Sequence, residues 1–165
     1  MSARLAVLLL ASLTVIGGLV WLTFSENQSH LLTLDGSILK IRTYPIEPEA
    51  TLVFVDFRVT NPTATPFVVN SVEMELERPN EETLGGGVMT RKEIQTFFQY
   101  EKLAGHEFND PLIIQDTIPG GETLDRMAAA RFEVPEAAVG SRSNLLLRIR
   151  EIDGATAEIE EHPEP

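Results

Sequence analysis

The chain has no cysteine in its 165 residues. That absence excludes disulfide bonds, catalysis by a thiol, cysteine-based zinc sites and iron–sulfur clusters. The fold must therefore be held together by packing and hydrogen bonds alone.

Basic residues are also few: the chain has 13 lysines and arginines against 25 acidic residues. Its formal net charge is therefore −12. A field of this sign repels nucleic acid and anionic lipid headgroups. We therefore predict no nucleic acid partner. A soluble, well-hydrated surface is the simplest interpretation of the charge.

Histidine is scarce too, and of the three histidines only His106 lies outside the N-terminal spacer and the C-terminal tail. A hydrolase would need His106 with an orienting acid, such as Glu107 or Asp110. No Gly-x-Ser-x-Gly or His-Glu-x-x-His motif occurs. We predict no catalytic residues, no cofactor and no metal site, and keep a hydrolase only as a remote alternative.

Residues 5–24 form a run of 20 without a charge. As a helix, this run is long enough to cross about 30 Å of hydrocarbon. Arg4 precedes it and the next basic residue is Lys40, so the positive-inside rule places the N-terminus in the cytoplasm. We predict a signal anchor over residues 1–25, with a single pass through the membrane and a domain that is periplasmic or extracellular.

A cleaved signal peptide is the alternative for the same segment. Thr23 and Ser25 are small enough to precede a cut before Glu26, and such a protein would be secreted. The apolar run is longer than the usual cleavable signal, which favours the uncleaved anchor.

Period-two alternation between Thr51 and Thr60 predicts a half-buried antiparallel strand. Proline and asparagine at Asn61-Pro62 then end it. On the outward side, Asp56 and Arg58 are close enough to predict a modest ion pair. The inward residues are Val53, Val55, Phe57 and Val59.

Further strands are indicated by similar runs that turn residues separate. Residues 67–77 are predicted to form a hairpin with the strand at 51–60. The run 31–46 is predicted to be broken at Asp35-Gly36, and from 155 only a strand residue or two is expected before an acidic tail. The other predicted strands are 111–118, 124–134 and 144–152.

This arrangement predicts a mainly β fold, an Ig-like antiparallel β-sandwich of six to eight strands with one short inserted helix. The cysteine pair and the core tryptophan of antibody domains are both missing. We place the sandwich at residues 26–157 and the acidic tail at 158–165.

The inserted helix is predicted near residues 90–104, after a glycine-rich loop that begins at Leu84. Thr90 and Glu93 have capping-box spacing, and an apolar stripe follows until Gly105. Such a stripe packs on a core or lines a partner-binding groove. The candidate partner-contact residues are Ile94, Phe97, Phe98, Tyr100 and His106.

Two segments carry a resemblance to known families. Residues 57–76, with the sequence Phe-Arg-Val-Thr-Asn-Pro-Thr at their start, resemble the strand, Asn-Pro turn and strand of late-embryogenesis-abundant type 2 domains, also called water-stress and hypersensitive-response domains. Residues 118–135, which end in Phe-Glu-Val-Pro, are similar to bacterial membrane-anchored Ig-like domains. The resemblance implies a non-enzymatic envelope or stress-associated domain, and neither family supplies catalytic residues to this chain.

Two functions therefore remain. The first is a membrane-anchored binding or structural domain that joins a protein partner in a cell-envelope assembly, with contacts from the segment between Leu84 and His106. The second is a stress-protective envelope domain that acts through its acidic surface without a partner. Fold alone does not decide between them, and a small-molecule ligand is not indicated by any motif.

Overall fold

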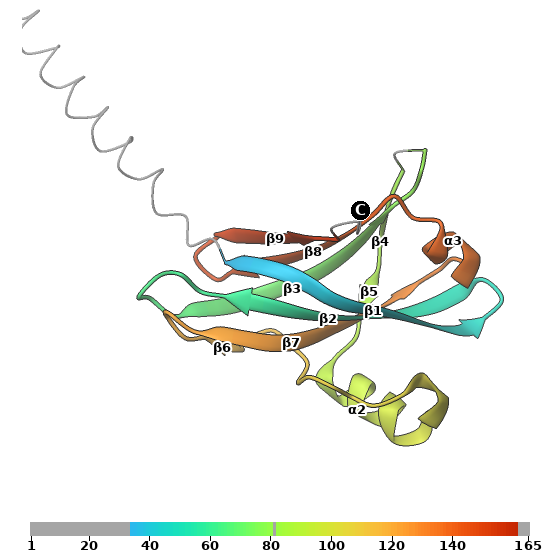
Figure 1. The fold of residues 1–165 in the computed structure, drawn as a ribbon, viewed down its shortest axis with the longest axis horizontal. Helices are drawn as coiled ribbons and strands as arrows, with labels where there is room; N and C mark the ends of the chain where they lie inside the picture. The colour runs from blue at the N-terminus through green and yellow to red at the C-terminus, as the bar shows by residue number, and fades with distance from the viewer. Residues whose placement is uncertain (1–33, 81, 162–165) are drawn as a thin grey trace, which may run out of the picture. The chain divides into compact units, whose positions relative to one another are not determined.

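The computed structural model describes residues 34–80 and 82–161, and these form two antiparallel β-sheets that pack into a β-sandwich (Figure 1). The anchor predicted at residues 1–25 lies outside the described residues. Within residues 34–80 and 82–161, no helix is long and apolar enough to cross a membrane.

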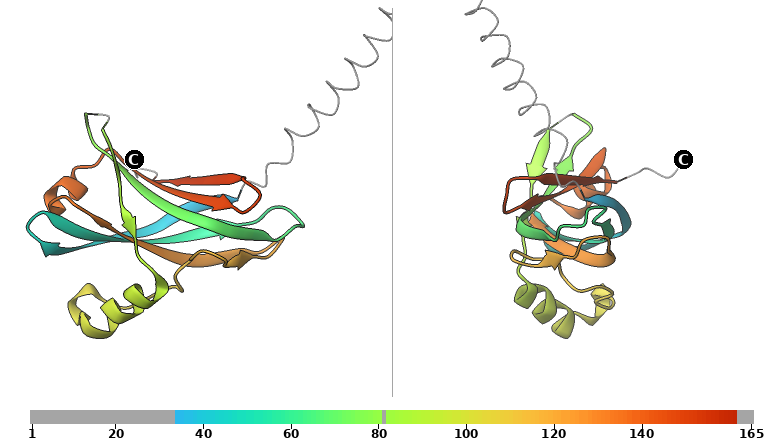
Figure 2. Two further views of the ribbon diagram at one scale, coloured as in Figure 1. Left: turned by 180° about the vertical axis from the view of Figure 1, so that it is seen from behind. Right: turned by 90° about the vertical axis from the view of Figure 1, so that its left-hand side faces the viewer.

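The strands of the first sheet follow the order β1-β2-β7-β5, and those of the second the order β4-β3-β8-β9. Figure 2 shows the domain from behind and from one side. A short strand, β6, also pairs with β3. The first sheet contains β1 (Asp35–Glu47), β2 (Ala50–Thr60), β7 (Thr123–Phe132) and β5 (Gly87–Val88). The second contains β4 (Thr83–Gly85), β3 (Phe67–Glu77), β6 (Thr117–Ile118), β8 (Asn144–Glu151) and β9 (Thr156–Glu160). The helical elements are α2 (Arg91–Tyr100), the 3-10 helix η1 (Lys102–Ala104) and α3 (Glu136–Gly140).

The inner faces of the two sheets form the main core, as the alternation predicted. The four inward residues of β2 are fully buried there. Inward residues of β7 and β8 join them in the same cluster, including Phe132, Leu145 and Leu147. Burying large side chains of this kind contributes about 1.5–3 kcal/mol each.

The hairpin predicted between residues 51–60 and 67–77 is wrong, because β2 and β3 belong to different sheets. The Asn61-Pro62 turn instead carries the chain across the sandwich. The buried Asn61 side chain fixes this crossing: its amide nitrogen donates to the carbonyls of Thr65 and Ile118, and its oxygen accepts from the Thr63 N–H at 3.1 Å. A crossing turn and a hairpin turn have the same local sequence signal, so the sequence did not separate them.

Both ends of the domain also differ from the expectation. Asp35 and Gly36, predicted to form a turn, are instead the first residues of β1, a strand of 13 residues with a bulge after Ile38. The first part of the predicted run, residues 31–33, lies outside the described residues. At the other end, β9 runs for five residues to Glu160 and places Ala157 and Ile159 in the core. Hairpin pairing with β8 supplies the order that composition did not indicate.

The first sheet is covered on its outer face as well, by a segment that we call the insertion (residues 86–116). It leaves the second sheet at Gly86, follows β7 through β5, forms α2 and returns beside β7 at Pro111 (Figure 1). A Cβ at Gly86 would lie 2.6 Å from Phe132 Cζ, so only glycine permits the chain to cross so closely.

Candidate functional site

The insertion contributes the edge strand β5 to the first sheet, and its centre is α2. The predicted capping box is confirmed: the Thr90 N–H donates to Glu93 at 2.7 Å, and the Glu93 N–H donates to the Thr90 hydroxyl. The Thr90 bonds lower the pKa of Glu93, since they favour its ionised form. The helix therefore begins at a defined residue.

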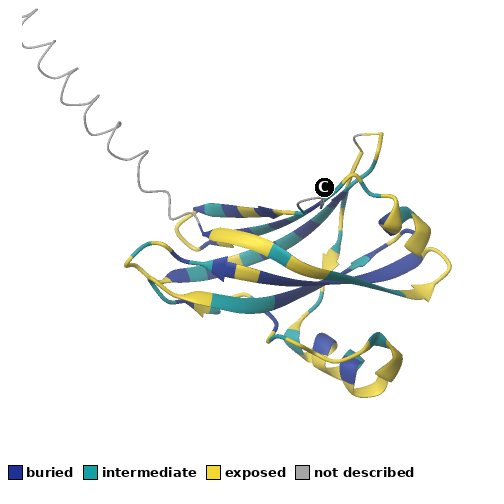
Figure 3. Ribbon diagram, in the orientation of Figure 1, coloured by how far each residue is buried: buried dark blue, intermediate teal, exposed yellow. Residues whose placement is uncertain are grey.

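One side of α2 packs on the outer face of the first sheet, and Figure 3 shows this side as buried and the opposite side as exposed. Ile94 and Phe98 are buried against Leu52 and Phe54 of β2. The rings of Phe54 and Phe98 have centroids 5.0 Å apart, a favourable aromatic contact. Strand β2 is therefore buried on both faces rather than on one.

Arg42 of β1 joins the insertion to the sheet through its charge. One guanidinium nitrogen donates to Asp56 at 3.1 Å, and the other donates to the carbonyls of Ala104 and His106. The second Asp56 oxygen accepts from Asn109 at 2.9 Å. Both charged side chains are largely withdrawn from water, with exposed fractions of 13% and 4%.

Aromatic rings surround the same guanidinium. It lies 5.2 Å from the centroid of Phe98 and 5.0 Å from that of Phe108. Cation–π attraction in such an environment adds to the hydrogen bonds. We call Arg42, Asp56 and Asn109 together the polar clamp, because they connect two strands of the sheet to the loop after η1.

A second tie lies near the end of α2. The Tyr44 hydroxyl of β1 donates to Glu101 at 2.8 Å. This hydrogen bond raises the pKa of Tyr44, with burial and the Glu101 charge adding to the effect. The insertion is thus fixed to β1 at two points.

The ion pair predicted between Asp56 and Arg58 is wrong. Asp56 pairs with Arg42, and Arg58 pairs with Asp125 of β7 at 2.7 Å. Side chains two residues apart on one strand are about 7 Å apart, whereas long side chains reach opposite or diagonal residues on the neighbouring strand. Arg58 is directly opposite Asp125. Arg42 is opposite Phe54 and reaches Asp56 diagonally. The cross-strand partners therefore form the pairs.

The candidate contact residues fall into two groups. Ile94 and Phe98 are buried, and Phe97 is partly covered by Tyr44 and Phe54. In contrast, 72% of Tyr100 is exposed, and His106 is exposed too. The stripe thus serves packing, and the end of α2 is the accessible part.

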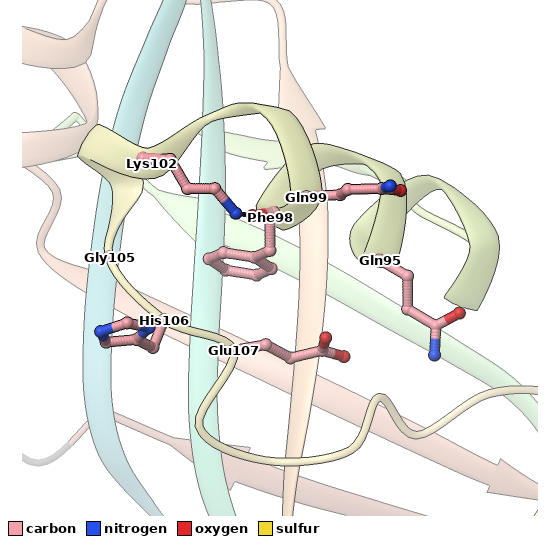
Figure 4. Close-up of a pocket in the computed structure, with 7 residues that line it drawn as sticks. All are labelled: Gln95, Phe98, Gln99, Lys102, Gly105, His106 and Glu107. Atoms are coloured by element: carbon pink, nitrogen blue, oxygen red, sulfur yellow. Dashed lines mark hydrogen bonds between the residues drawn. The ribbon is translucent and has the colours of Figure 1, made fainter.

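A hollow of about 390 Å³ lies between α2 and the loop at residues 105–107. Figure 4 shows the Phe98 ring between helix and loop, with Glu107 across from Gln95. Lys102 donates to the Phe98 carbonyl at 3.3 Å. The surface of the hollow is more apolar than polar, but its rim carries amide, amino, imidazole and carboxylate groups that can donate or accept hydrogen bonds.

The His106 ring packs edge-on to Phe108, with centroids 6.4 Å apart. Among the hydrogen bonds of the described residues, none joins the His106 ring to a hydroxyl or a carboxylate. No group of three or more metal-ligating side chains comes together in residues 34–80 and 82–161 either. The surroundings of His106 suit a surface contact.

Beside the hollow, the tip of the insertion exposes apolar side chains to solvent. Leu103 is 94% exposed and Phe108 is 58% exposed, and both lie near Tyr100 in the sequence. We call Tyr100, Leu103 and Phe108 the apolar tip. Their exposed side chains are available for contact with a partner.

The polar clamp was missed by the sequence reasoning, although β2 carries a signal for it. The residues on its outer side begin with Leu52 and Phe54, which a solvated face does not favour. A strand that is apolar on both sides indicates cover on both sides. Asp56 among those residues then requires a buried partner.

No known protein family matches the chain, and no curated protein matches it. A solved structure, an uncharacterized β-sandwich protein from Clostridium difficile 630, is similar at 11% identity with a TM-score of 0.42. The match covers 79% of this chain and 86% of that chain.

Proposed function

We propose that the protein is a membrane-anchored, extracytoplasmic binding domain of the Ig-like type, and a subunit or accessory protein of a cell-envelope assembly. The uncharged run at residues 5–24 supports the anchor, and the −12 charge supports a domain that stays hydrated outside the membrane. Its protein partner binds the insertion.

The observation that carries this proposal is the apolar tip. The polar clamp and the Tyr44–Glu101 bond hold the insertion in place, so Tyr100, Leu103 and Phe108 are presented without a large cost in ordering. Aromatic and large apolar residues at the centre of an interface contribute most of its binding energy.

Photo-crosslinking in the producing cells tests the proposal. The full chain carries p-benzoylphenylalanine at Leu103 or, as a control, at the exposed Thr83 of β4. We expect a discrete adduct with one envelope protein from position 103 and none from position 83. Equal labelling from both positions, or a lone monomer after gentle detergent extraction, contradicts the proposal.

The anchor has a separate test. We expect the chain to stay in the membrane fraction after alkaline washing and its domain to be digested by protease added outside the inner membrane. A chain released into the soluble fraction would instead support cleavage before Glu26.

A partner-independent stress-protective domain is the second candidate, and the strong negative charge favours it. A deletion strain should then lose tolerance to drying or osmotic shock. Expression of the Leu103→Glu variant in the deletion strain should restore that tolerance fully, because this function needs no contact at the apolar tip.

A further inference from the structure

The outer edge of β3 is paired at both ends but open between them. At one end of this edge, residues 115–118 form backbone hydrogen bonds with β3 up to Val69. At the other end, residues 83–86 form backbone hydrogen bonds with β3 up to Met74. The Met74 carbonyl accepts from the Gly86 N–H at 2.8 Å. Within residues 34–80 and 82–161, no strand pairs with this edge at residues 70–73.

Alternation along the strand identifies the free backbone groups. In an antiparallel ladder, successive residues turn their N–H and C=O to opposite sides. Glu77 faces β8, since its carbonyl accepts from the Ser143 N–H, and the Met74 carbonyl faces the other way. Val72, two residues before Met74, therefore turns one donor and one acceptor toward the open edge.

A hollow of about 240 Å³ lies beside this opening. Its walls are the two segments by which the insertion leaves and returns, around residues 88–91 and 112–114. Most of the lining is apolar, and Val88 and Ile114 are exposed at 37% and 58%. The apolar lining residues are Val72, Val88, Met89, Leu112, Ile113 and Ile114.

One ion pair holds the two walls together. Arg91, the first residue of α2, donates to both oxygens of Asp116 at 3.1 and 2.9 Å, and the Ile113 N–H donates to the same carboxylate. The exposed fractions of the two side chains are 36% and 29%. An ion pair this exposed contributes little by itself. Backbone hydrogen bonds to β7 fix both walls, from the Met89 N–H to the Ala129 carbonyl and from the Leu112 N–H to the Met127 carbonyl, so the hollow is already formed in the free protein.

We propose that this opening binds a short extended peptide segment of a partner protein. One residue of the segment pairs with Val72 through two backbone hydrogen bonds, as a strand added to an open sheet edge does. Its side chain then lies on the same face as Val72 and enters the hollow, so an aliphatic residue the size of valine or leucine fits.

The surroundings define the peptide further. Residues 83–86 and 115–118 already occupy the edge on either side, so the residues that flank the bound position turn away from β3 and the paired segment is short. Neutral or basic flanking residues fit the −12 charge. This site is separate from the apolar tip, and it does not depend on the proposed function.

A photo-reactive peptide tests the inference on the full chain. The probe is acetyl-Lys-Thr-photoleucine-Thr-Lys-amide, and crosslinked positions are mapped by mass spectrometry. A control peptide has the same sequence with an N-methyl group on photoleucine, which removes the donor to Val72. We expect crosslinks to residues 71–73, 88–91 or 112–114, and about tenfold fewer with the methylated peptide.

Matched variants locate the contact. Ile114→Asp should reduce crosslinking about tenfold, whereas Ile152→Asp, at a comparably exposed isoleucine outside the hollow, should leave it unchanged. Crosslinks elsewhere, or equal crosslinking by both peptides, overturn the inference. Competition by 1-hexanol but not by the unlabelled peptide also overturns it, because the hollow would then take apolar small molecules.

Discussion

The two faces of β2 are both buried, but different groups cover them. The inner face carries four apolar residues that meet the second sheet, and it contains no charge. The outer face carries Leu52 and Phe54 beside the buried Asp56, and a helix with a polar clamp covers it. Apolar packing fills the space between the two sheets, whereas a buried charge pair also joins the insertion to the first sheet.

This difference predicts two kinds of opening. Separating the sheets exposes the whole core, so it requires global unfolding. Lifting the insertion exposes one face of one sheet and returns Arg42 and Asp56 to water, so it can occur locally. Substitutions on the two faces should therefore act on different transitions.

The largest effect is expected from Phe57→Ala on the inner face. It should lower the free energy of global unfolding by about 3–5 kcal/mol, since it leaves a cavity in the main core. Phe98→Ala, on the outer layer, should lower it by less, because the insertion can open separately. Urea denaturation of the full chain measures both, and equal losses would remove the distinction between the two layers.

The next effect concerns the polar clamp. Arg42→Met keeps the bulk but leaves Asp56 buried without its counter-charge, a change that costs about 3 kcal/mol. Because the chain has no cysteine, a single Ile94→Cys thiol reports opening of the insertion. Its labelling should accelerate about 100-fold in Arg42→Met.

The double variant Arg42→Met with Asp56→Leu is the control for that prediction. Replacing both charges by apolar groups removes the uncompensated carboxylate, so most of the protection should return. If the double variant labels as fast as the single one, the hydrogen bonds of Arg42 to the loop, rather than the charge of Asp56, hold the insertion.

A smaller effect is expected at the capping box. Thr90→Ala removes a hydrogen-bonded N-cap and should destabilise α2 by about 1 kcal/mol, which corresponds to about fivefold faster labelling of Ile94→Cys. Thr96→Ala makes the same change on the exposed side of α2. It should not accelerate labelling, because alanine favours a helix.

The smallest effect depends on pH and lies in the second sheet. Burial raises the pKa of Glu151, with the Asp153 charge adding and a hydrogen bond from the Val68 N–H opposing. The pKa of Glu151 is therefore higher in the folded protein than in the unfolded chain. The stability that protonated Glu151 contributes is fully present below its pKa in the unfolded chain, and it is lost as the pH rises through its pKa in the folded protein.

Glu151→Gln should therefore raise the melting temperature at pH 7 and have little effect near pH 3. Thermal unfolding of the full chain at both pH values measures this difference. Glu160→Gln, at an exposed position on β9, is the control and should change neither value. A Glu151→Gln variant that is less stable at pH 7 would mean that the carboxylate has a stabilising partner.

Local patterns predicted most strands because alternation depends only on which face is buried. The inward residues of β2, β7 and β8 and the capping box of α2 follow from such patterns. Pairing was not predictable in the same way: the turn at Asn61 crosses between the sheets, and that depends on carbonyls at Thr65 and Ile118. In the polar clamp, Arg42 and Asp56 are 14 positions apart and Asp56 and Asn109 are 53 positions apart, beyond any local spacing.

Hydrogen exchange of the unmodified full chain tests most directly whether the insertion is a separate layer. The amides of Val53 to Val59 in β2 should exchange only through global unfolding, and those of Phe97 to Tyr100 in α2 through a smaller opening with a lower free energy. Equal opening free energies for both sets, with the same denaturant dependence, would contradict the account.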